Sequence, residues 1–223
     1  MADTTIPLSV GLAGSSAIVI AALRVLMRSV DDAMSTNELA VAALAIESRR
    51  LGIAAGLQDR VVQAFNRAML MQFGPESTRS GPGVFTPVRT AGDLHLFVAS
   101  RATTSEPSQI RFRRPDRHRR HADSRRFCCG CSCSIRSRRA GAAMDATFDT
   151  RASILDLARG HVEMIEAARA VGAYANCTGS GGSVVVLAPS AGVEAAARQS
   201  LNKLGCIIVS IETASPDIEP GAG

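Results

Sequence analysis

The sequence predicts an α+β protein, and three observations support that class. Helical and strand-like patterns alternate along the chain, both before residue 105 and after residue 140. With 223 residues, 46% of them apolar, the chain can bury one large core or two smaller ones. Since it has one Tyr and no Trp, that core must consist mainly of Ala, Val, Leu and Ile.

Helices dominate the prediction for the first 75 residues. Residues 7–10 have the pattern of a strand end, and a tight loop follows from Gly11 to Ser16. Ser15 or Ser16 can cap a helix that continues to about Ser29. Apolar residues at helical spacing, with Ser35 or Thr36 before them and Gly52 after them, predict a second helix within residues 35–52. A third helix is predicted from residue 58, followed by a strand at residues 69–73.

The remaining predicted elements are separated by stretches of different composition. Residues 74–93 are rich in Gly, Pro, Ser and Thr, which predicts a loop or linker. Helical periodicity covers residues 150–173 and 193–205. Short apolar runs predict strands at residues 94–102, 183–189 and 206–212, and the last eleven residues have the composition of a disordered tail.

Arginine is concentrated in one segment that differs from the rest of the chain. Residues 111–139 hold eleven Arg and two Asp, a charge of +9, so the other residues carry −4 of the total of +5. One interpretation is a nucleic-acid-binding tail. Another is a metal site, although its cysteines lack the two-pair spacing of zinc ligands: Cys128, Cys129, Cys131 and Cys133. A third hypothesis is a compensated frameshift in an Arg-rich coding sequence.

Several features argue against secreted and membrane-spanning classes. The two other cysteines, Cys177 and Cys206, do not make the framework of a disulfide-rich domain. The first ten residues lack a basic region followed by an apolar core, so no signal peptide is predicted. The apolar run at residues 17–23 is too short to cross a bilayer. These observations favour a cytoplasmic protein.

The sequence GLAGSS at residues 11–16 is a candidate anion-binding loop. Small residues at a helix start let backbone N–H groups converge, and the positive end of the helix adds to their attraction for phosphate. The two serine hydroxyls could also reach a phosphate or its Mg²⁺. No Lys follows the glycines, so the loop is not a Walker motif. Alternatively, the glycines only allow close packing.

Two carboxylates follow this loop at a spacing of twelve residues. Glu47 near the end of the second predicted helix could be a solvated residue paired with Arg50, or a ligand of Mg²⁺. Asp59 could be a helix-start charge favoured by the dipole. It could instead be the base that orients a substrate hydroxyl towards a γ-phosphate.

A second glycine loop, CTGSGGSVVV, lies at residues 177–186 and could make a sharp turn or approach a ligand. Together with PLSVGLAGSSA and ESRRLGIAAGLQDR it resembles the three motifs of the GHMP kinases, in the family's order. The phosphate loop of that family usually reads Pro-x-x-x-Gly-Leu-Gly-Ser-Ser-Ala, with Gly where this chain has Ala13. The segment LGIAAGLQDRVVQAF is most similar to the glucuronokinase-like branch of sugar kinases.

The resemblance implies phosphoryl transfer from ATP to a hydroxyl of a sugar or sugar acid, with Mg²⁺. Ser16 and Glu47 would then reach the metal, with Ser15 as a further candidate, and Asp59 would be the catalytic carboxylate. Two backbone segments would hold the phosphates, and their residues are Gly11, Leu12, Ala13, Gly14, Ser15, Ser16 and Ala17 in the first and Gly179, Ser180, Gly181 and Gly182 in the second.

The resemblance also implies a division of the chain. A partial N-terminal GHMP kinase domain, like domain 2 of ribosomal protein S5, would occupy residues 1–75. A linker and the first strand of the C-terminal part would follow at residues 76–110. The Arg/Cys-rich segment at residues 111–139 is predicted to be disordered. A ferredoxin-like C-terminal domain would occupy residues 140–213, and a disordered tail residues 214–223.

The chain departs from the family pattern at its start. Family members carry a substantial segment before the phosphate loop, whereas here the loop begins ten residues after Met1. We therefore expect weak or absent turnover, and a non-functional kinase remnant is an alternative to an active enzyme. An exposed sheet edge would favour self-association. Membranes and nucleic acid are not the expected partners, although DNA binding through the Arg-rich segment is the rival function.

Overall fold

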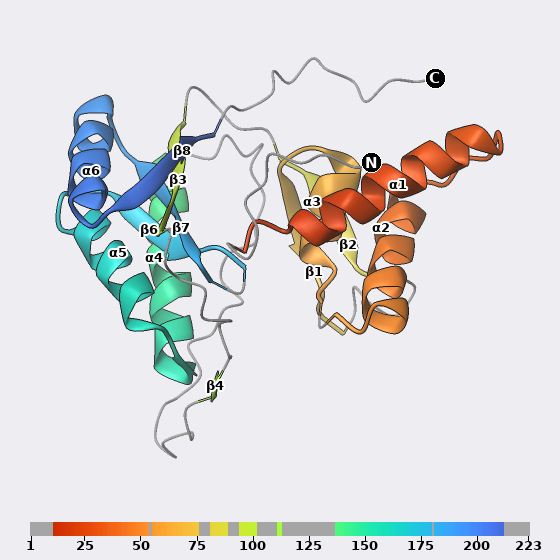
Figure 1. Ribbon diagram of the computed structural model, residues 1–223, viewed down its shortest axis with the longest axis horizontal. Helices are drawn as coiled ribbons and strands as arrows, with labels where there is room; N and C mark the ends of the chain where they lie inside the picture. The colour runs from red at the N-terminus through yellow and green to blue at the C-terminus, as the bar shows by residue number, and fades with distance from the viewer. Residues whose placement is uncertain are drawn as a thin grey trace. The chain divides into compact units, whose positions relative to one another are not determined.

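The structure is a computed structural model that describes residues 11–53, 55–75, 81–88, 94–101, 111–112, 137–179 and 181–211. These residues form two compact units of mixed helix and strand, which confirms the predicted α+β class (Figure 1). The first unit contains the described residues from Ala13 to Val88. The second contains Gly11, Leu12 and the described residues from Leu94 to Ile211. The predicted domain boundaries stay predictions.

The first unit is a small helical layer with a two-stranded sheet. Its elements are α1 (Gly14–Ser29), α2 (Thr36–Ala45), a π-helical turn η1 (Ile46–Arg50), α3 (Gln58–Phe65), and the antiparallel strands β1 (Met69–Gln72) and β2 (Val84–Pro87). The three helices bury small and branched side chains against one another: Ile20, Leu39, Ala40, Ala43, Val61 and Ala64. Alanine at three of these six positions lets the helix backbones approach closely.

Most sequence predictions for this unit are confirmed, and two are wrong. Ser35 caps α2 in a capping box with Glu38, as the sequence suggests. Neither Ser15 nor Ser16 caps α1, because the helix already begins at Gly14 and its cap residue is Ala13, which makes no side-chain cap bond. The predicted loop of residues 74–93 contains β2, which pairs with β1 despite its Gly- and Pro-rich flanks.

The second unit is built on a four-stranded antiparallel sheet in the order β6-β7-β3-β8. Its elements are β3 (His95–Arg101), β4 (Arg111–Phe112), α4 (Ser137–Ile154), β5 (Leu155–Asp156), α5 (Arg159–Arg169), β6 (Tyr174–Cys177), β7 (Ser183–Ala188), α6 (Ala191–Lys203) and β8 (Cys206–Ser210). Strand β3 lies between β7 and β8, so segments far apart in sequence meet at the sheet centre. The predicted strands at 94–102, 183–189 and 206–212 are therefore confirmed.

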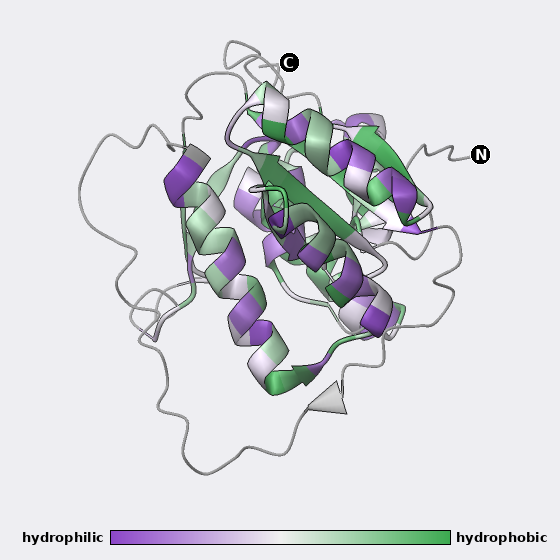
Figure 2. Cartoon of the chain, turned by 90° about the vertical axis from the view of Figure 1, so that its left-hand side faces the viewer, coloured by the Kyte–Doolittle hydropathy of each residue, from purple (hydrophilic) through white to green (hydrophobic). Residues whose placement is uncertain are grey.

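Helices α5 and α6 pack side by side against this sheet, and α4 lies along β6 (Figure 1). The core between them contains Phe97, Met164, Ile165, Val184, Val186 and Leu201. Figure 2 shows mainly apolar strands, with helices in front of them on which polar and apolar residues alternate. Burying these apolar helix faces is what fixes α5 and α6 on the sheet. Cys177 and Cys206 are buried free thiols in this core.

The second unit differs from the predictions in two of its elements. The helical pattern at 150–173 is interrupted by β5, and β6 was not predicted. Most of the Arg/Cys-rich segment lies outside the described residues, as do the predicted strand end at residues 7–10 and the predicted C-terminal tail. From β3 to β8 the four strands of the main sheet and the three helices follow a β-α-α-β-β-α-β succession, with one helix more than the β-α-β-β-α-β pattern, and the ferredoxin-like assignment stays a prediction.

None of the helices in the described ranges is both long and apolar enough to span a bilayer.

Candidate active site

The phosphate-loop motif leads into α1 through a residue in the left-handed conformation. Ala13 has φ 55° and ψ 35°, a region in which Gly is favoured over residues that carry a Cβ atom. Its carbonyl oxygen accepts hydrogen bonds from the Ser16 hydroxyl at 2.9 Å and the Gln63 Nε2 at 3.0 Å. The Ala17 N–H also donates to it, at 3.2 Å. The turn is therefore held from both α1 and α3.

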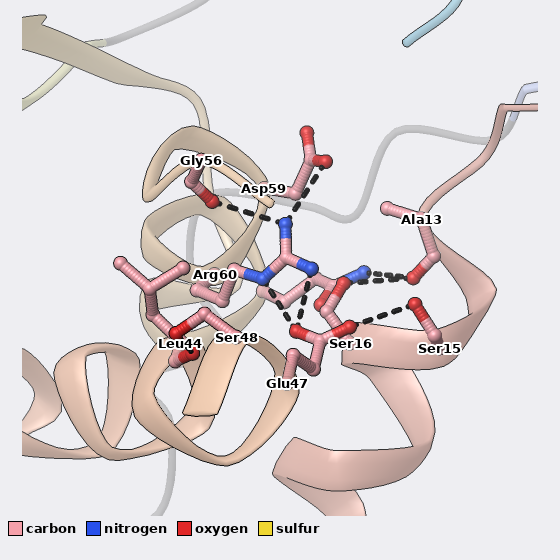
Figure 3. A network of polar contacts seen from close by, with 10 residues as sticks. Ala13, Ser15, Ser16, Leu44, Glu47, Ser48, Gly56, Asp59 and Arg60 are labelled. Atoms are coloured by element: carbon pink, nitrogen blue, oxygen red, sulfur yellow. Dashed lines mark hydrogen bonds and ion pairs between the residues drawn. The ribbon is translucent and has the colours of Figure 1, made fainter. Parts of the chain in front are cut away.

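Glu47 lies in the π-helical turn and is fully buried, with 0% of its surface exposed. Its Oε1 accepts a hydrogen bond from the Ser15 hydroxyl at 2.7 Å, so the first helix and the π turn meet at this carboxylate (Figure 3). The alternative of a solvated residue paired with Arg50 is therefore wrong. Local π turns inside helices are frequent at functional sites, since the extra residue redirects the side chains that follow it.

Arg60 neutralises the buried carboxylate of Glu47. Its Nε and Nη2 atoms lie 2.6 and 2.5 Å from Glu47 Oε2, and only 4% of the residue is exposed. The third nitrogen, Nη1, donates to the Gly56 carbonyl at 3.0 Å and lies 3.4 Å from Asp59 Oδ2 (Figure 3). One guanidinium thus connects both predicted carboxylates.

Asp59 occupies the first turn of α3, and its side chain is 51% exposed. The carboxylate therefore has one side against Arg60 and the other open to solvent or to a ligand. A carboxylate placed in this way can accept a hydrogen bond from a substrate hydroxyl.

The C-terminal glycine motif forms the turn between β6 and β7. Gly179, Gly181 and Gly182 have φ values of 30°, 101° and 98°, so the turn uses backbone conformations that other residues rarely adopt. Ser180, predicted as part of the same motif, lies outside the described residues. The Gly182 N–H donates to His161 Nε2 at 2.6 Å, and the ring is buried.

His161 must be neutral to accept this hydrogen bond, with its proton on Nδ1. Burial of the ring lowers the pKa of His161 below its ordinary value, and the positive charges of Arg101 and Arg151 lower it further by smaller amounts. The Arg151 Nη2 also donates to the Gly179 carbonyl at 2.9 Å. Two side chains from α4 and α5 therefore hold the glycine turn at its two ends.

Gly11, the first residue of the phosphate-loop motif, packs against this turn within the second unit. A Cβ atom at Gly11 would lie 2.7 Å from the Gly181 carbonyl oxygen and 2.8 Å from that of Thr178. A Cβ atom at Gly179 would lie 2.7 Å from the Gly11 carbonyl oxygen. The two backbones touch because both positions lack a side chain, and their φ values are positive.

The structure thus groups the predicted residues in two places. Ser15, Glu47 and Asp59 are linked through Arg60 in the first unit, whereas Ser16 is fully buried and bonds its own turn. Within the described ranges, no group of three or more His, Cys, Asp and Glu residues could by itself hold a metal ion. Any metal here would need hydroxyl or phosphate oxygens in addition to a carboxylate.

Sequence reasoning missed Arg60, Gln63 and His161. Arg60 adjoins Asp59 in sequence, but only its burial reveals the partner Glu47, thirteen residues earlier. Gln63 has a weak signal, because it lies one turn after Asp59 on α3; its Oε1 is buried without a hydrogen-bond partner in the described part of the chain. His161 reaches Gly182 across twenty-one residues, which no local pattern predicts.

Comparison with known proteins finds relatives of one family. Residues 1–67 match the model of the GHMP kinases N terminal domain. Glucuronokinase 1 and Probable glucuronokinase 2 of Arabidopsis thaliana are each 34% identical to the chain over 209 residues, which cover 84% of it. The chain is related to the GHMP kinases. It spans 56% of the length of these two relatives.

The fold of the chain is similar to that of a solved GHMP kinase structure. The Streptococcus pneumoniae phosphomevalonate kinase structure aligns with 88% of this chain and 68% of its own, at a TM-score of 0.56 and 12% identity. At that identity the likeness concerns the fold alone. It confirms the GHMP kinase-like α+β architecture that the sequence motifs predict.

Proposed function

We propose that this chain is an ATP-dependent phosphotransferase that acts on a sugar hydroxyl, as a sugar kinase of glucuronokinase type. The observation that carries the proposal is the connection of Ser15, Glu47, Arg60 and Asp59 beside the start of α1. Phosphoryl transfer needs a backbone cradle for phosphates, a carboxylate for the metal and an acidic group near the acceptor. The first unit has a candidate for each.

The donor chemistry of the site fits Mg²⁺ and ATP. Mg²⁺ prefers hard oxygen ligands and is usually bound by one or two carboxylates together with phosphate oxygens. Glu47 and the Ser15 hydroxyl offer such oxygens, and they are 2.7 Å apart. Glu47 and Ser15, with Ser16 as the residue named by the family resemblance, would hold the ion. Bound Mg²⁺ would neutralise charge on the transferred phosphoryl group.

Each remaining residue has a role that follows from its position. The backbone from Gly11 to Ala17 enters α1, whose N-terminal N–H groups can bind the phosphates of ATP. Asp59, partly exposed and next to Arg60, would accept a hydrogen bond from the sugar hydroxyl and orient it for attack. Catalysis would consist mainly of positioning and charge neutralisation.

The substrate class is supported by the relatives. The two Arabidopsis thaliana proteins are named as glucuronokinases, and the bacterial structure holds phosphomevalonate and AMPPNP. A negatively charged sugar acid such as glucuronate is therefore the acceptor we propose. By the family resemblance, the C-terminal glycine turn, Gly179 to Gly182, would close over the phosphate and substrate side.

The experiment measures MgATP binding and transfer separately in the full chain. We expect calorimetry to detect MgATP binding, and expect the Asp59→Asn variant to keep that binding while losing transfer of ³²P to glucuronate. Asp32→Asn, an acidic surface residue in the loop after α1, is the matched control and should change neither quantity.

Two results would contradict the proposal. One is a folded chain that does not bind MgATP at any concentration tested. The other is transfer to glucuronate that is unchanged in Asp59→Asn. Binding of MgATP without transfer in the unmodified chain would support the nucleotide site and the expectation of weak or absent turnover, and it would contradict the proposed transferase activity of this chain.

A further inference from the structure

We propose that Arg60 is an internal counter-ion that occupies the carboxylate of the metal site until Mg²⁺ replaces it. This inference rests on the proposed role of Glu47 in binding Mg²⁺. It adds a residue that sets the affinity of the site for the metal. Arg60 lies on α3, one position after Asp59, and its guanidinium is directed towards the π turn (Figure 3).

Glu47 is buried away from solvent. A carboxylate with 0% exposure has lost its water shell, so its charge must be balanced by a cation or by proton uptake. Arg60 supplies that cation with two nitrogens at 2.6 and 2.5 Å from the same oxygen, Oε2. The charge of Glu47 is thus balanced from within the chain.

Most acceptor positions of the Glu47 carboxylate are already occupied. An ionised carboxylate offers about four acceptor positions, and three are taken by two Arg60 nitrogens and the Ser15 hydroxyl. A Mg²⁺ ion that bound Oε2 would come within contact range of the guanidinium. Two cations at that separation repel each other in a buried site, so Arg60 must withdraw at least in part.

Arg60 has a second set of partners besides Glu47. Its Nη1 atom donates to the Gly56 carbonyl at 3.0 Å and lies 3.4 Å from Asp59 Oδ2. Asp59 is half exposed, so a guanidinium released from Glu47 can turn towards it without losing every ionic contact. Metal binding would therefore shift the positive charge of Arg60 from the metal ligand towards the acceptor-side carboxylate.

The test is the Mg²⁺ dependence of thermal stability in the full chain without nucleotide. Melting temperatures are measured in EDTA and at rising MgCl₂, with NaCl added to equalise ionic strength, for the unmodified protein, Arg60→Lys and Arg60→Met. Lys keeps the charge but cannot make the two-nitrogen contact with one oxygen. We expect apparent Mg²⁺ affinity to rise from Arg to Lys to Met, with a larger melting shift in Arg60→Met.

Two controls isolate the mechanism. Arg24→Met removes another arginine of the first unit, whose guanidinium donates to the Ala64 carbonyl at 3.0 Å, and should leave the Mg²⁺ response unchanged. The double variant Glu47→Gln/Arg60→Met should lose the enhanced response. If Arg60→Met does not fold, the comparison of Arg60→Lys with the unmodified protein decides, since a tighter Mg²⁺ response is expected there too.

Equal or weaker Mg²⁺ responses in Arg60→Lys and Arg60→Met would overturn the inference, as would a double variant that keeps the enhancement. If those results accompany MgATP binding that Glu47→Gln abolishes, the inference fails while the proposed function stands. If Glu47→Gln and the Arg60 variants alike leave Mg²⁺ and MgATP responses unchanged, the proposed metal role of Glu47 fails as well.

Discussion

Arg60 and Glu47 form a buried ion pair in which two guanidinium nitrogens contact the same carboxylate oxygen. Removing one partner of such a pair leaves an uncompensated charge in the protein interior. We therefore expect Glu47→Gln to lower the free energy of unfolding by about 3–5 kcal/mol, measured by urea denaturation.

The double variant Glu47→Gln/Arg60→Met tests the cause of that loss. Because it removes both charges, it should be less destabilised than the sum of the two single variants. Glu38→Gln is a suitable control, since Glu38 is an exposed member of the α2 capping box and its substitution should lower stability much less than Glu47→Gln. Additive losses in the double variant would contradict an energetic coupling between Glu47 and Arg60.

Ala13 provides a second prediction, on the conformation of the phosphate loop. Its φ of 55° costs a residue with a Cβ atom about 1–2 kcal/mol relative to Gly. Part of the gain from Ala13→Gly is offset by the greater freedom of the unfolded chain. We expect a net stabilisation of about 1 kcal/mol, measured as a higher midpoint of urea denaturation.

Ala17→Gly is the matched control for this substitution. Ala17 lies in the first turn of the same helix, where Gly should be destabilising by about 0.5–1 kcal/mol. Opposite signs for the two substitutions are the expected result. A destabilised Ala13→Gly protein would show that the residue does not adopt the left-handed conformation in solution.

Sequence patterns predicted the local parts of this fold better than the contacts that complete the site. Ser35 and the apolar spacing after it defined α2, because caps and helical periodicity are local properties. The start of α1 was misplaced, since a left-handed Ala13 ends the loop earlier than a serine cap would. Glu47 is buried together with its partners Arg60 and Ser15. Tertiary packing brings these three residues together, so their spacing along the chain does not predict the contact.

Gly181 gives a third prediction, on the C-terminal glycine turn. Its φ is 101°, and a Cβ atom there would lie 2.8 Å from His161 Cε1. Both effects disfavour Gly181→Ala, so we expect a loss of more than about 1 kcal/mol of unfolding free energy. Gly192→Ala is the control, because it lies in α6 with no atom within 4 Å of the added methyl group. It should be neutral or stabilising by up to about 1 kcal/mol.

The final prediction concerns pH and the hydrogen bond from Gly182 to His161. Burial, with Arg101 and Arg151 nearby, lowers the pKa of His161 in the folded state. The unfolded chain therefore binds the proton more readily, and folding stability falls as the solution becomes more acidic. The contribution of His161 is complete above its unfolded pKa of about 6.5 and is lost as the pH falls through the lowered folded value.

Unfolding free energies measured between neutral and acidic pH test this sign. His161→Gln keeps a side-chain oxygen that can accept the Gly182 N–H but does not titrate, so its stability should depend less on pH than that of the unmodified protein. His95→Gln is the control, because it removes a different imidazole, whose Nδ1 lies 2.8 Å from Glu194 Oε2. This control should retain the acid sensitivity. An identical pH dependence of His161→Gln and the unmodified protein would mean that the imidazole is not the group whose protonation weakens the glycine turn.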